Sequence, residues 1–126
     1  MRTAHCSCGL LQIMCEGNPE KVSACYCREC QRRTGSAFGV AVFFTQKATK
    51  VTGSSSSFAR IGDSGLPVVH HFCPYCGSTV YWYPAKKPGQ VAVAIGCFAD
   101  KDFPAPSQAV FEHRQPAWVT VTLAPK

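Results

Sequence analysis

The chain has 126 residues, nine of them cysteine, and a formal net charge of +6 with histidine neutral. Its 46% apolar and 16% charged residues exclude a disordered chain and predict one globular domain over residues 1–126. No apolar run reaches the roughly 18 residues of a membrane helix, and residues 1–9 have no apolar signal-peptide core. We therefore expect a cytoplasmic protein that does not associate with membranes.

The elements expected along the chain are short strands rich in β-branched and aromatic residues, separated by glycine, proline and serine, which predicts a mainly β fold of layered antiparallel sheets. The expected strands cover residues 10–15, 22–26, 38–44, 49–52, 57–61, 68–72, 79–83, 91–95, 109–112 and 119–123. Residues 28–33 are charged and end at Thr34-Gly35-Ser36, which predicts about one helical turn. The turn at residues 53–56 predicts a hairpin between residues 49–52 and 57–61. Helical structure is thus expected only as short turns.

The high cysteine content needs a chemical reason. A disulfide framework is disfavoured because the cysteine number is odd and because disulfides belong to oxidising compartments. Metal ligation by thiolates fits a reducing environment. We therefore searched the sequence for cysteines at the spacings that chelate a metal ion.

Two closely spaced cysteine pairs predict a filled metal site. Cys73 and Cys76 are separated by two residues, Cys6 and Cys8 by one, and a glycine follows each pair. Such a glycine lets backbone amides point at the sulfurs. Together the pairs supply the four ligands of a structural Zn²⁺ site. The alternatives are buried thiols at Cys6 and Cys8, or a redox-active pair at Cys73 and Cys76.

A second cluster supplies three sulfurs within six residues, at Cys25, Cys27 and Cys30. Three protein ligands with one free position are typical of catalytic zinc. The alternative is a closed structural site, and spacing alone does not decide between the two. An iron–sulfur cluster is disfavoured, because the three cysteines are closer together than in the usual cluster motifs. The residues considered as a fourth ligand are Cys15, Cys97, His5, His70, His71 and His113.

An open site with three thiolates predicts sulfur chemistry in preference to hydrolysis. Three thiolates on Zn²⁺ leave a net negative charge, which weakens the ion as a generator of hydroxide but suits an incoming thiolate. Arg28, Arg32 and Arg33 could hold the carboxylates of an anionic thiol such as glutathione; a solvated charged turn is the alternative. Backbone amides near Thr34-Gly35-Ser36 are candidates for steadying a developing alkoxide.

The positive charge gives little support to nucleic-acid binding. The lysines and arginines are scattered, the only tight group is Arg28, Arg32 and Arg33, and no basic run is interleaved with aromatic residues. A small anionic substrate suits this charge at least as well. The alternative function is a non-catalytic zinc module that binds nucleic acid or protein.

Several other residues have expected roles outside the metal sites. His70 and His71 are expected to point to opposite faces of one strand. Trp82 and Trp118 are expected to pack in the protein, with the late loop also allowing Trp118 to line a pocket. Arg114 is expected to be exposed to solvent, with substrate contact as the alternative.

The cysteine motifs, taken in order, resemble those of the glutathione-dependent formaldehyde-activating enzyme family, which also includes a centromere-associated vertebrate protein. The matching segments are Cys6-Ser7-Cys8-Gly9, Cys25-Tyr26-Cys27-Arg28-Glu29-Cys30, Thr34-Gly35-Ser36, Phe72-Cys73-Pro74-Tyr75-Cys76-Gly77-Ser78, residues 96–100 and Pro116-Ala117-Trp118. They cover nearly the whole chain.

The resemblance implies a tent-like arrangement of β-sheets with two Zn²⁺ per chain. It implies a structural zinc on Cys6, Cys8, Cys73 and Cys76, and a catalytic zinc on Cys25, Cys27 and Cys30. The implied activity is that of a carbon–sulfur lyase, which joins glutathione to formaldehyde as S-hydroxymethylglutathione. The chain departs from the family pattern at Ala99, which replaces an acidic residue, and at Cys97, an additional thiol that we expect to be buried.

Overall fold

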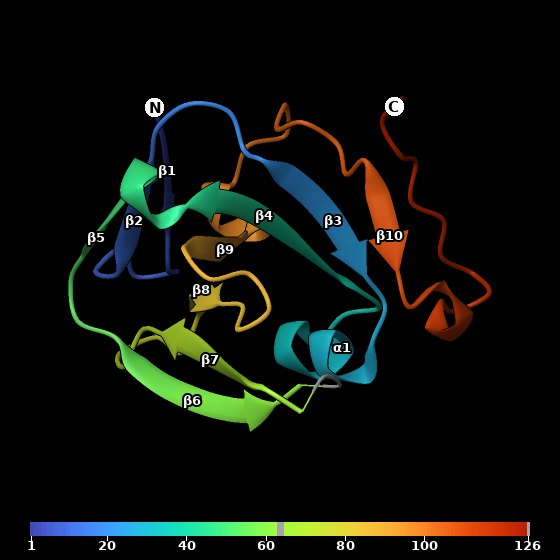
Figure 1. The fold of residues 1–126 in the computed structure, drawn as a ribbon, viewed down its shortest axis with the longest axis horizontal. Helices are drawn as coiled ribbons and strands as arrows, with labels where there is room; N and C mark the ends of the chain where they lie inside the picture. Colours follow the sequence, from blue (N-terminus) through green and yellow to red (C-terminus); the bar gives the residue numbers. More distant parts are fainter. Residues whose placement is uncertain (63–64, 126) are drawn as a thin grey trace.

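The computed structural model describes residues 1–62 and 65–125, and these form a mainly β protein with one α-helix (Figure 1). The strands are β1 (Arg2–His5), β2 (Gln12–Cys15), β3 (Lys21–Cys25), β4 (Gly39–Thr45), β5 (Thr49–Thr52), β6 (Ser56–Ile61), β7 (Pro67–Phe72), β8 (Thr79–Tyr83), β9 (Gln90–Ala94) and β10 (Gln108–Val110). The helix is α1 (Arg28–Thr34), and the 3-10 helices are η1 (Gln46–Ala48), η2 (Ile95–Phe98) and η3 (Glu112–Arg114). The predicted fold class is confirmed.

The strands form two sheets. One has the order β1-β2-β5 and the other has the order β10-β3-β4-β9-β8-β7-β6. Neighbouring strands are antiparallel in both sheets, except that β10 runs parallel to β3, with Ala109 opposite Ala24. The prediction of antiparallel sheets is therefore right for all described strand pairs but this one.

The core lies where the smaller sheet packs against the larger one. Ile13 and Cys15 from β2 meet buried side chains of the central strands, such as Phe44 of β4 and Val80 of β8. Burying a side chain of this size contributes about 1.5–3 kcal/mol relative to leaving it in water. The strands β8 and β9 have three buried residues each, so they read as continuous apolar runs and not as an alternating pattern.

The hairpin predicted around residues 53–56 is wrong. The strand β5 pairs with β2 in the smaller sheet, whereas β6 pairs with β7 in the larger one. At Gly53, which follows β5, φ is +91° and an added Cβ would lie 1.9 Å from the carbonyl oxygen of Leu10. Glycine here permits a close approach of two backbone segments, and the chain then crosses from one sheet to the other.

Two further differences lie at the chain ends. A strand forms at Arg2–His5 that the polar sequence gave no reason to expect, and it pairs with β2. No strand forms at residues 119–123. There the amide of Val119 bonds to the carbonyl of Pro116, so the segment turns on itself, and Val119 is buried at 9% exposure.

The helix α1 is positioned by the residues at its two ends. Its N-cap is Cys27, whose Sγ accepts a hydrogen bond from the amide of Cys30. It ends at Gly35, which has a φ of +65° and donates its amide to the carbonyl of Gln31, as in a glycine C-cap. In Figure 1, α1 lies below the ends of β3 and β4 and beside β6 and β7.

Candidate metal and substrate site

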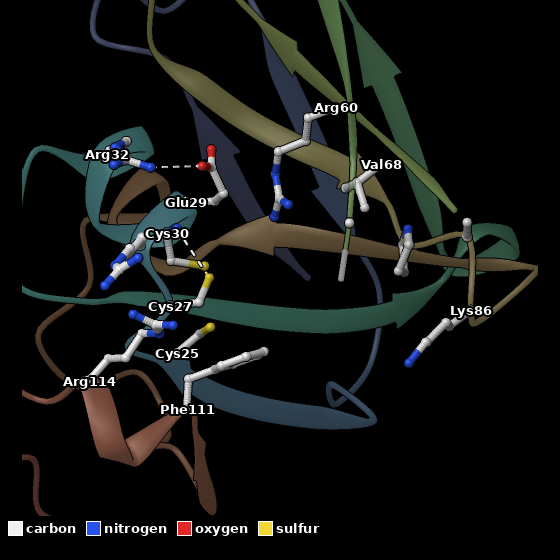
Figure 2. Close-up of a pocket in the computed structure, with 14 residues that line it drawn as sticks. Cys25, Cys27, Glu29, Cys30, Arg32, Arg60, Val68, Lys86, Phe111 and Arg114 are labelled. Carbon is white, nitrogen blue, oxygen red and sulfur yellow. Dashed lines mark hydrogen bonds and ion pairs between the residues drawn. The ribbon is translucent and has the colours of Figure 1, made fainter. Parts of the chain in front are cut away.

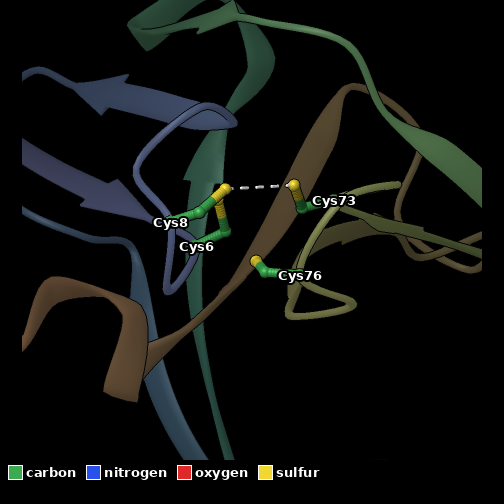
Figure 3. Close-up of side chains that lie close together, drawn as sticks. All are labelled: Cys6, Cys8, Cys73 and Cys76. Carbon is green, nitrogen blue, oxygen red and sulfur yellow. Dashed lines mark hydrogen bonds between the residues drawn. The ribbon is translucent and has the colours of Figure 1, made fainter.

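The first cysteine cluster joins the loop after β1 to the loop after β7 (Figure 3). The sulfurs of Cys6, Cys8, Cys73 and Cys76 all lie within 4.8 Å of one another. The separations from Cys8 to Cys6 and to Cys73 are both 3.6 Å. A tetrahedral zinc with Zn–S bonds of about 2.3 Å places its sulfurs about 3.8 Å apart. The four cysteines therefore fit a zinc ion.

Backbone amides and the hydroxyl of Ser78 donate hydrogen bonds to sulfurs of this cluster. The amide of Leu11 donates to Cys6 Sγ at 3.3 Å and the amide of Tyr75 to Cys73 Sγ at 3.4 Å. The hydroxyl of Ser78 and then its backbone amide lower the pKa of the Cys76 thiol to about 5. Amide donors of this kind offset the charge that thiolates bring to a metal. Ser78 also bonds to Ser7 Oγ at 3.0 Å, so it ties the two loops together.

The second cluster is built by the segment that leads from β3 into α1. Cys25 ends β3, Cys27 caps the helix and Cys30 lies in its first turn. Their sulfurs lie within 4.8 Å of one another. Hydrogen bonds from Cys25 and then Cys30 lower the pKa of the Cys27 thiol to about 2. Hydrogen bonds with Cys27 and then Cys30 raise the pKa of the Cys25 thiol. The hydrogen bonds within the cluster thus favour a thiolate at Cys27.

No fourth ligand joins the three sulfurs among the histidine, cysteine and carboxylate side chains at residues 1–62 and 65–125. The six candidates lie elsewhere. Cys15 is in the core, His70 and His71 contact Trp82 and Tyr81, and His113 packs on Phe111. His5 Nδ1 lies 2.6 Å from the carbonyl oxygen of Cys6, and Cys97 lies against Thr79. Of the described residues, the cluster therefore offers three ligands.

The three cysteines line a cavity of about 520 Å³ that is strongly cationic (Figure 2). Its basic lining residues are Arg28, Arg32, Arg60, Lys86 and Arg114. The acidic residue of the lining, Glu29, forms an ion pair with Arg32 at 3.0 Å. Figure 2 shows Arg60 and Arg114 approaching the sulfurs from two different sides. The volume is in the range of small-molecule sites, and the charge suits an anionic ligand.

A family model described as "Glutathione-dependent formaldehyde-activating enzyme" matches residues 1–114 of the chain. The chain belongs to this family. Membership agrees with the predicted resemblance and with an enzyme that acts on formaldehyde and glutathione. It also places both cysteine clusters and the cationic cavity within the matched part of the chain.

A crystal structure of a Rhodobacter sphaeroides protein has the same fold, with a TM-score of 0.59 and 20% sequence identity. The similarity covers 75% of this chain and 85% of the other. No curated protein matches the chain. Among the described residues, no helix has the length and apolar character needed to cross a membrane.

The structure divides the arginines that the sequence grouped as carboxylate ligands. Arg28 and Arg32 line the cavity of this family member. Arg33 does not; its guanidinium lies over the ring of Trp82, 4.3 Å from the centroid. Two residues before it, Gln31 turns to the other side of the helix and bonds to the carbonyls of Tyr26 and Arg114. The helical twist thus separates neighbouring residues that the sequence places together.

Three basic residues of the cavity were not predicted as ligands. Arg60 comes from β6, Lys86 from the loop after β8, and Arg114 from η3. Arg114 was expected to be exposed to solvent but lines the cavity. No local motif marks Arg60 or Lys86, because only the pairing of β6 and β7 and the path of the chain bring them near α1.

The predicted alkoxide site has no free amide donors at two of its positions. The amides of Gly35 and Ser36 both bond to the carbonyl of Gln31. Thr34 and Ser36 line a separate cavity of about 470 Å³, together with Cys97. Cys97, expected to be buried, is half-buried, and burial raises the pKa of its thiol to about 11. Trp118, expected to pack or line a pocket, is 82% exposed, whereas Trp82 is buried.

Proposed function

We propose that this chain is a zinc-dependent carbon–sulfur lyase that forms or cleaves the adduct of glutathione and formaldehyde. The observation that carries the proposal is the three-sulfur cluster that opens, without a fourth described ligand, into a cationic cavity. Family membership supports the two substrates. The cysteines of the first cluster are proposed to hold a second zinc with a structural role.

The chemistry joins a nucleophilic sulfur to a carbonyl carbon. A zinc ion held by Cys25, Cys27 and Cys30 would supply a position at which a thiol binds as its thiolate. In the forward direction the thiol loses its proton, its sulfur forms a bond to the carbonyl carbon, and the carbon–oxygen double bond becomes a single bond. The oxygen takes up a proton, and the reverse sequence releases the aldehyde.

The cationic residues of the cavity are proposed to bind and orient glutathione. Glutathione carries two carboxylates, and the guanidinium groups of Arg60 and Arg114 are directed toward the region of the sulfurs (Figure 2). Arg32 is less available because it pairs with Glu29. Arginine binds carboxylates through two parallel hydrogen bonds. Fixing both carboxylates would hold the thiol in one orientation at the reacting centre, which is how positioning contributes to rate.

The alternative of a non-catalytic module receives no specific support. Five basic residues line the cavity beside the cysteines, which is the arrangement expected for a small anion. A nucleic-acid surface would instead place its basic residues along an extended face.

The test is a titration of the metal-loaded protein with glutathione and with S-methylglutathione, which cannot form a thiolate. The proposal predicts that glutathione binds at least tenfold more tightly than S-methylglutathione, and that Cys27→Ser removes this difference in affinity. Cys27→Ser is also expected to abolish the exchange between formaldehyde and its glutathione adduct, which NMR measures. Equal binding of the two peptides, together with unchanged exchange in Cys27→Ser, would contradict the proposal. Cys97→Ser is the matched control, since that thiol lies outside both clusters.

A further inference from the structure

A smaller cavity, called the second cavity below and distinct from the 470 Å³ cavity beside Cys97, adjoins the cysteine cavity on the side of β6 and β7. It has a volume of about 270 Å³ and shares Glu29, Arg32 and Arg60 with the cysteine cavity. The second cavity is therefore an extension of the proposed substrate site.

Aromatic side chains form one wall of this second cavity: Phe58 from β6, and His70 and Phe72 from β7. The remaining lining residues are polar or charged, namely Glu29, Arg32, Arg33, Arg60 and Thr79. Phe58 is 63% exposed, which is unusual for so large an apolar side chain beside a cationic site. Burial, followed by the charges of Arg33 and Arg60, lowers the pKa of His70 to about 4. His70 is thus neutral at pH 7 and adds its ring to the aromatic wall.

Arg33 gives the second cavity a cation that is not used by the protein itself. It lines this cavity as well as the 470 Å³ cavity beside Cys97, and its guanidinium lies over the ring of Trp82, 4.3 Å from the centroid. None of the hydrogen bonds and ion pairs among residues 1–62 and 65–125 involves Arg33. A half-buried guanidinium without an acceptor favours an anion, and its planar fork matches a carboxylate. Stacking on Trp82 fixes the orientation of the fork before any ligand arrives.

Formaldehyde has no substituent that could occupy such a space. We propose that the second cavity receives the substituent of a larger aldehyde substrate, one with a ring-sized apolar body that ends in a carboxylate. This inference rests on the proposed function, because it places the aldehyde carbon at the three cysteines. The apolar body would then extend past Glu29 and Arg32 to Phe58 and Phe72, with its carboxylate at Arg33.

The chemical step is the same addition as for formaldehyde. The thiol of glutathione loses its proton, its sulfur bonds to the aldehyde carbon, the carbonyl double bond opens and the oxygen takes up a proton. The product is a hemithioacetal, and no oxidant or reductant is consumed. Selectivity among aldehydes would come from binding of the substituent, since an apolar contact and an ion pair are absent for formaldehyde.

The experiment compares formaldehyde, benzaldehyde and 4-formylbenzoate as partners of glutathione, with exchange rates measured by NMR on the metal-loaded protein. The native chain is expected to have a kcat/KM for 4-formylbenzoate at least tenfold above that for benzaldehyde. In Arg33→Met this ratio is expected to fall to about one. In Phe58→Ala both aromatic aldehydes are expected to lose about three- to tenfold relative to formaldehyde. Lys101→Met removes one charge at an 89% exposed side chain and is expected to change none of these ratios.

The outcomes separate this inference from the proposed function. If formaldehyde is turned over but the ratios are the same in the native chain, Arg33→Met and Phe58→Ala, the second cavity is not a substituent site and the proposed function stands. If no aldehyde is turned over, the proposed function fails. Binding of the unreactive 4-hydroxymethylbenzoate then tests whether the second cavity binds an aromatic acid. A shift of the Trp82 indole signal in the native chain that is lost in Arg33→Met supports the cavity as a site for aromatic acids. No shift in either protein overturns it.

Discussion

The first cysteine cluster allows a prediction of stability that can be worked out from the structure. Cys8 is exposed, whereas Cys6 and Cys73 are buried, so Cys8→Ser removes a metal ligand without leaving a hole in the core. Cys8 and Cys73 are 65 positions apart. A cross-link that closes a loop of this length restricts the unfolded chain by about 4 kcal/mol in the loop-entropy estimate.

A loss of about 4 kcal/mol is large for a single chain of this size, whose total stability is expected to be about 5–15 kcal/mol. It corresponds to a fall in Tm of about 15 °C. The assay is thermal unfolding by circular dichroism of the metal-loaded native chain and Cys8→Ser, each with and without a chelator. The chelator is expected to destabilise the native chain strongly and Cys8→Ser only weakly. Cys27→Ser is the control, since it leaves the first cluster intact and should remain strongly sensitive to chelation.

The reasoning would be refuted by a Cys8→Ser protein that unfolds at the same temperature as the native chain. It would also be refuted if chelation lowered the Tm of Cys8→Ser as much as that of the native chain, because the tie between the two loops would then not depend on this metal site. A fall in Tm for Cys27→Ser equal to that for Cys8→Ser would contradict the division into a structural and a functional cluster.

Three further predictions follow from the structure. Gly53→Ala is expected to destabilise the fold by at least about 2 kcal/mol in urea unfolding, because the added Cβ would meet the Leu10 carbonyl at 1.9 Å. The control is Gly17→Ala, which should cost only about 1–2 kcal/mol, because Gly17 has a φ of +75° but no atom within 4 Å of an added Cβ. A loss at Gly53 equal to or smaller than that at Gly17 would contradict this prediction. The pKa of His70 is lowered to about 4 in the fold from about 6.5 in the unfolded chain, so its contribution to stability is complete above about pH 6.5 and is lost as the pH falls toward 4. Between pH 7 and pH 5, the free energy of unfolding in urea should fall by about 1–2 kcal/mol less for His70→Phe than for the native chain. An equal fall in both proteins would contradict a buried neutral His70. Arg114→Met is expected to weaken glutathione binding about tenfold in calorimetric titration, as the loss of a charged hydrogen-bonded pair does. Arg2→Met, which lies outside the cavity, should leave the affinity unchanged. Equal affinity in both variants would show that Arg114 is not part of the glutathione site.

The cysteine clusters could be predicted from the sequence because ligand spacing is a local property for each pair. Cys73 and Cys76 are separated by only two residues, and the trio at Cys25, Cys27 and Cys30 lies within one strand end and one helical turn. The pairing of Cys6 and Cys8 with Cys73 and Cys76 followed from counting ligands. The mainly β class followed from the density of β-branched and aromatic residues.

The cationic cavity could not be predicted in the same way because it is a product of tertiary structure. Arg60 reaches the cysteines only because β6 pairs with β7 and not with β5, and the sequence predicted the opposite pairing. In the structure β5 pairs with β2, and Gly53 lies close to the backbone of Leu10, so the arrangement depends on segments far apart in sequence. Arg33 was grouped with Arg28 and Arg32 but lines a different cavity, because neighbouring residues on a helix point in different directions.

The central claim is that the second cluster holds zinc with three protein sulfurs and leaves a position for a thiol. Zinc X-ray absorption of the metal-loaded protein, with and without glutathione, tests it most directly. The account predicts two zinc ions per chain. When glutathione is added, a fourth sulfur should replace one oxygen or nitrogen ligand at the second zinc. This change should be absent in Cys27→Ser. A sulfur coordination that is already complete at both ions before glutathione is added would contradict it.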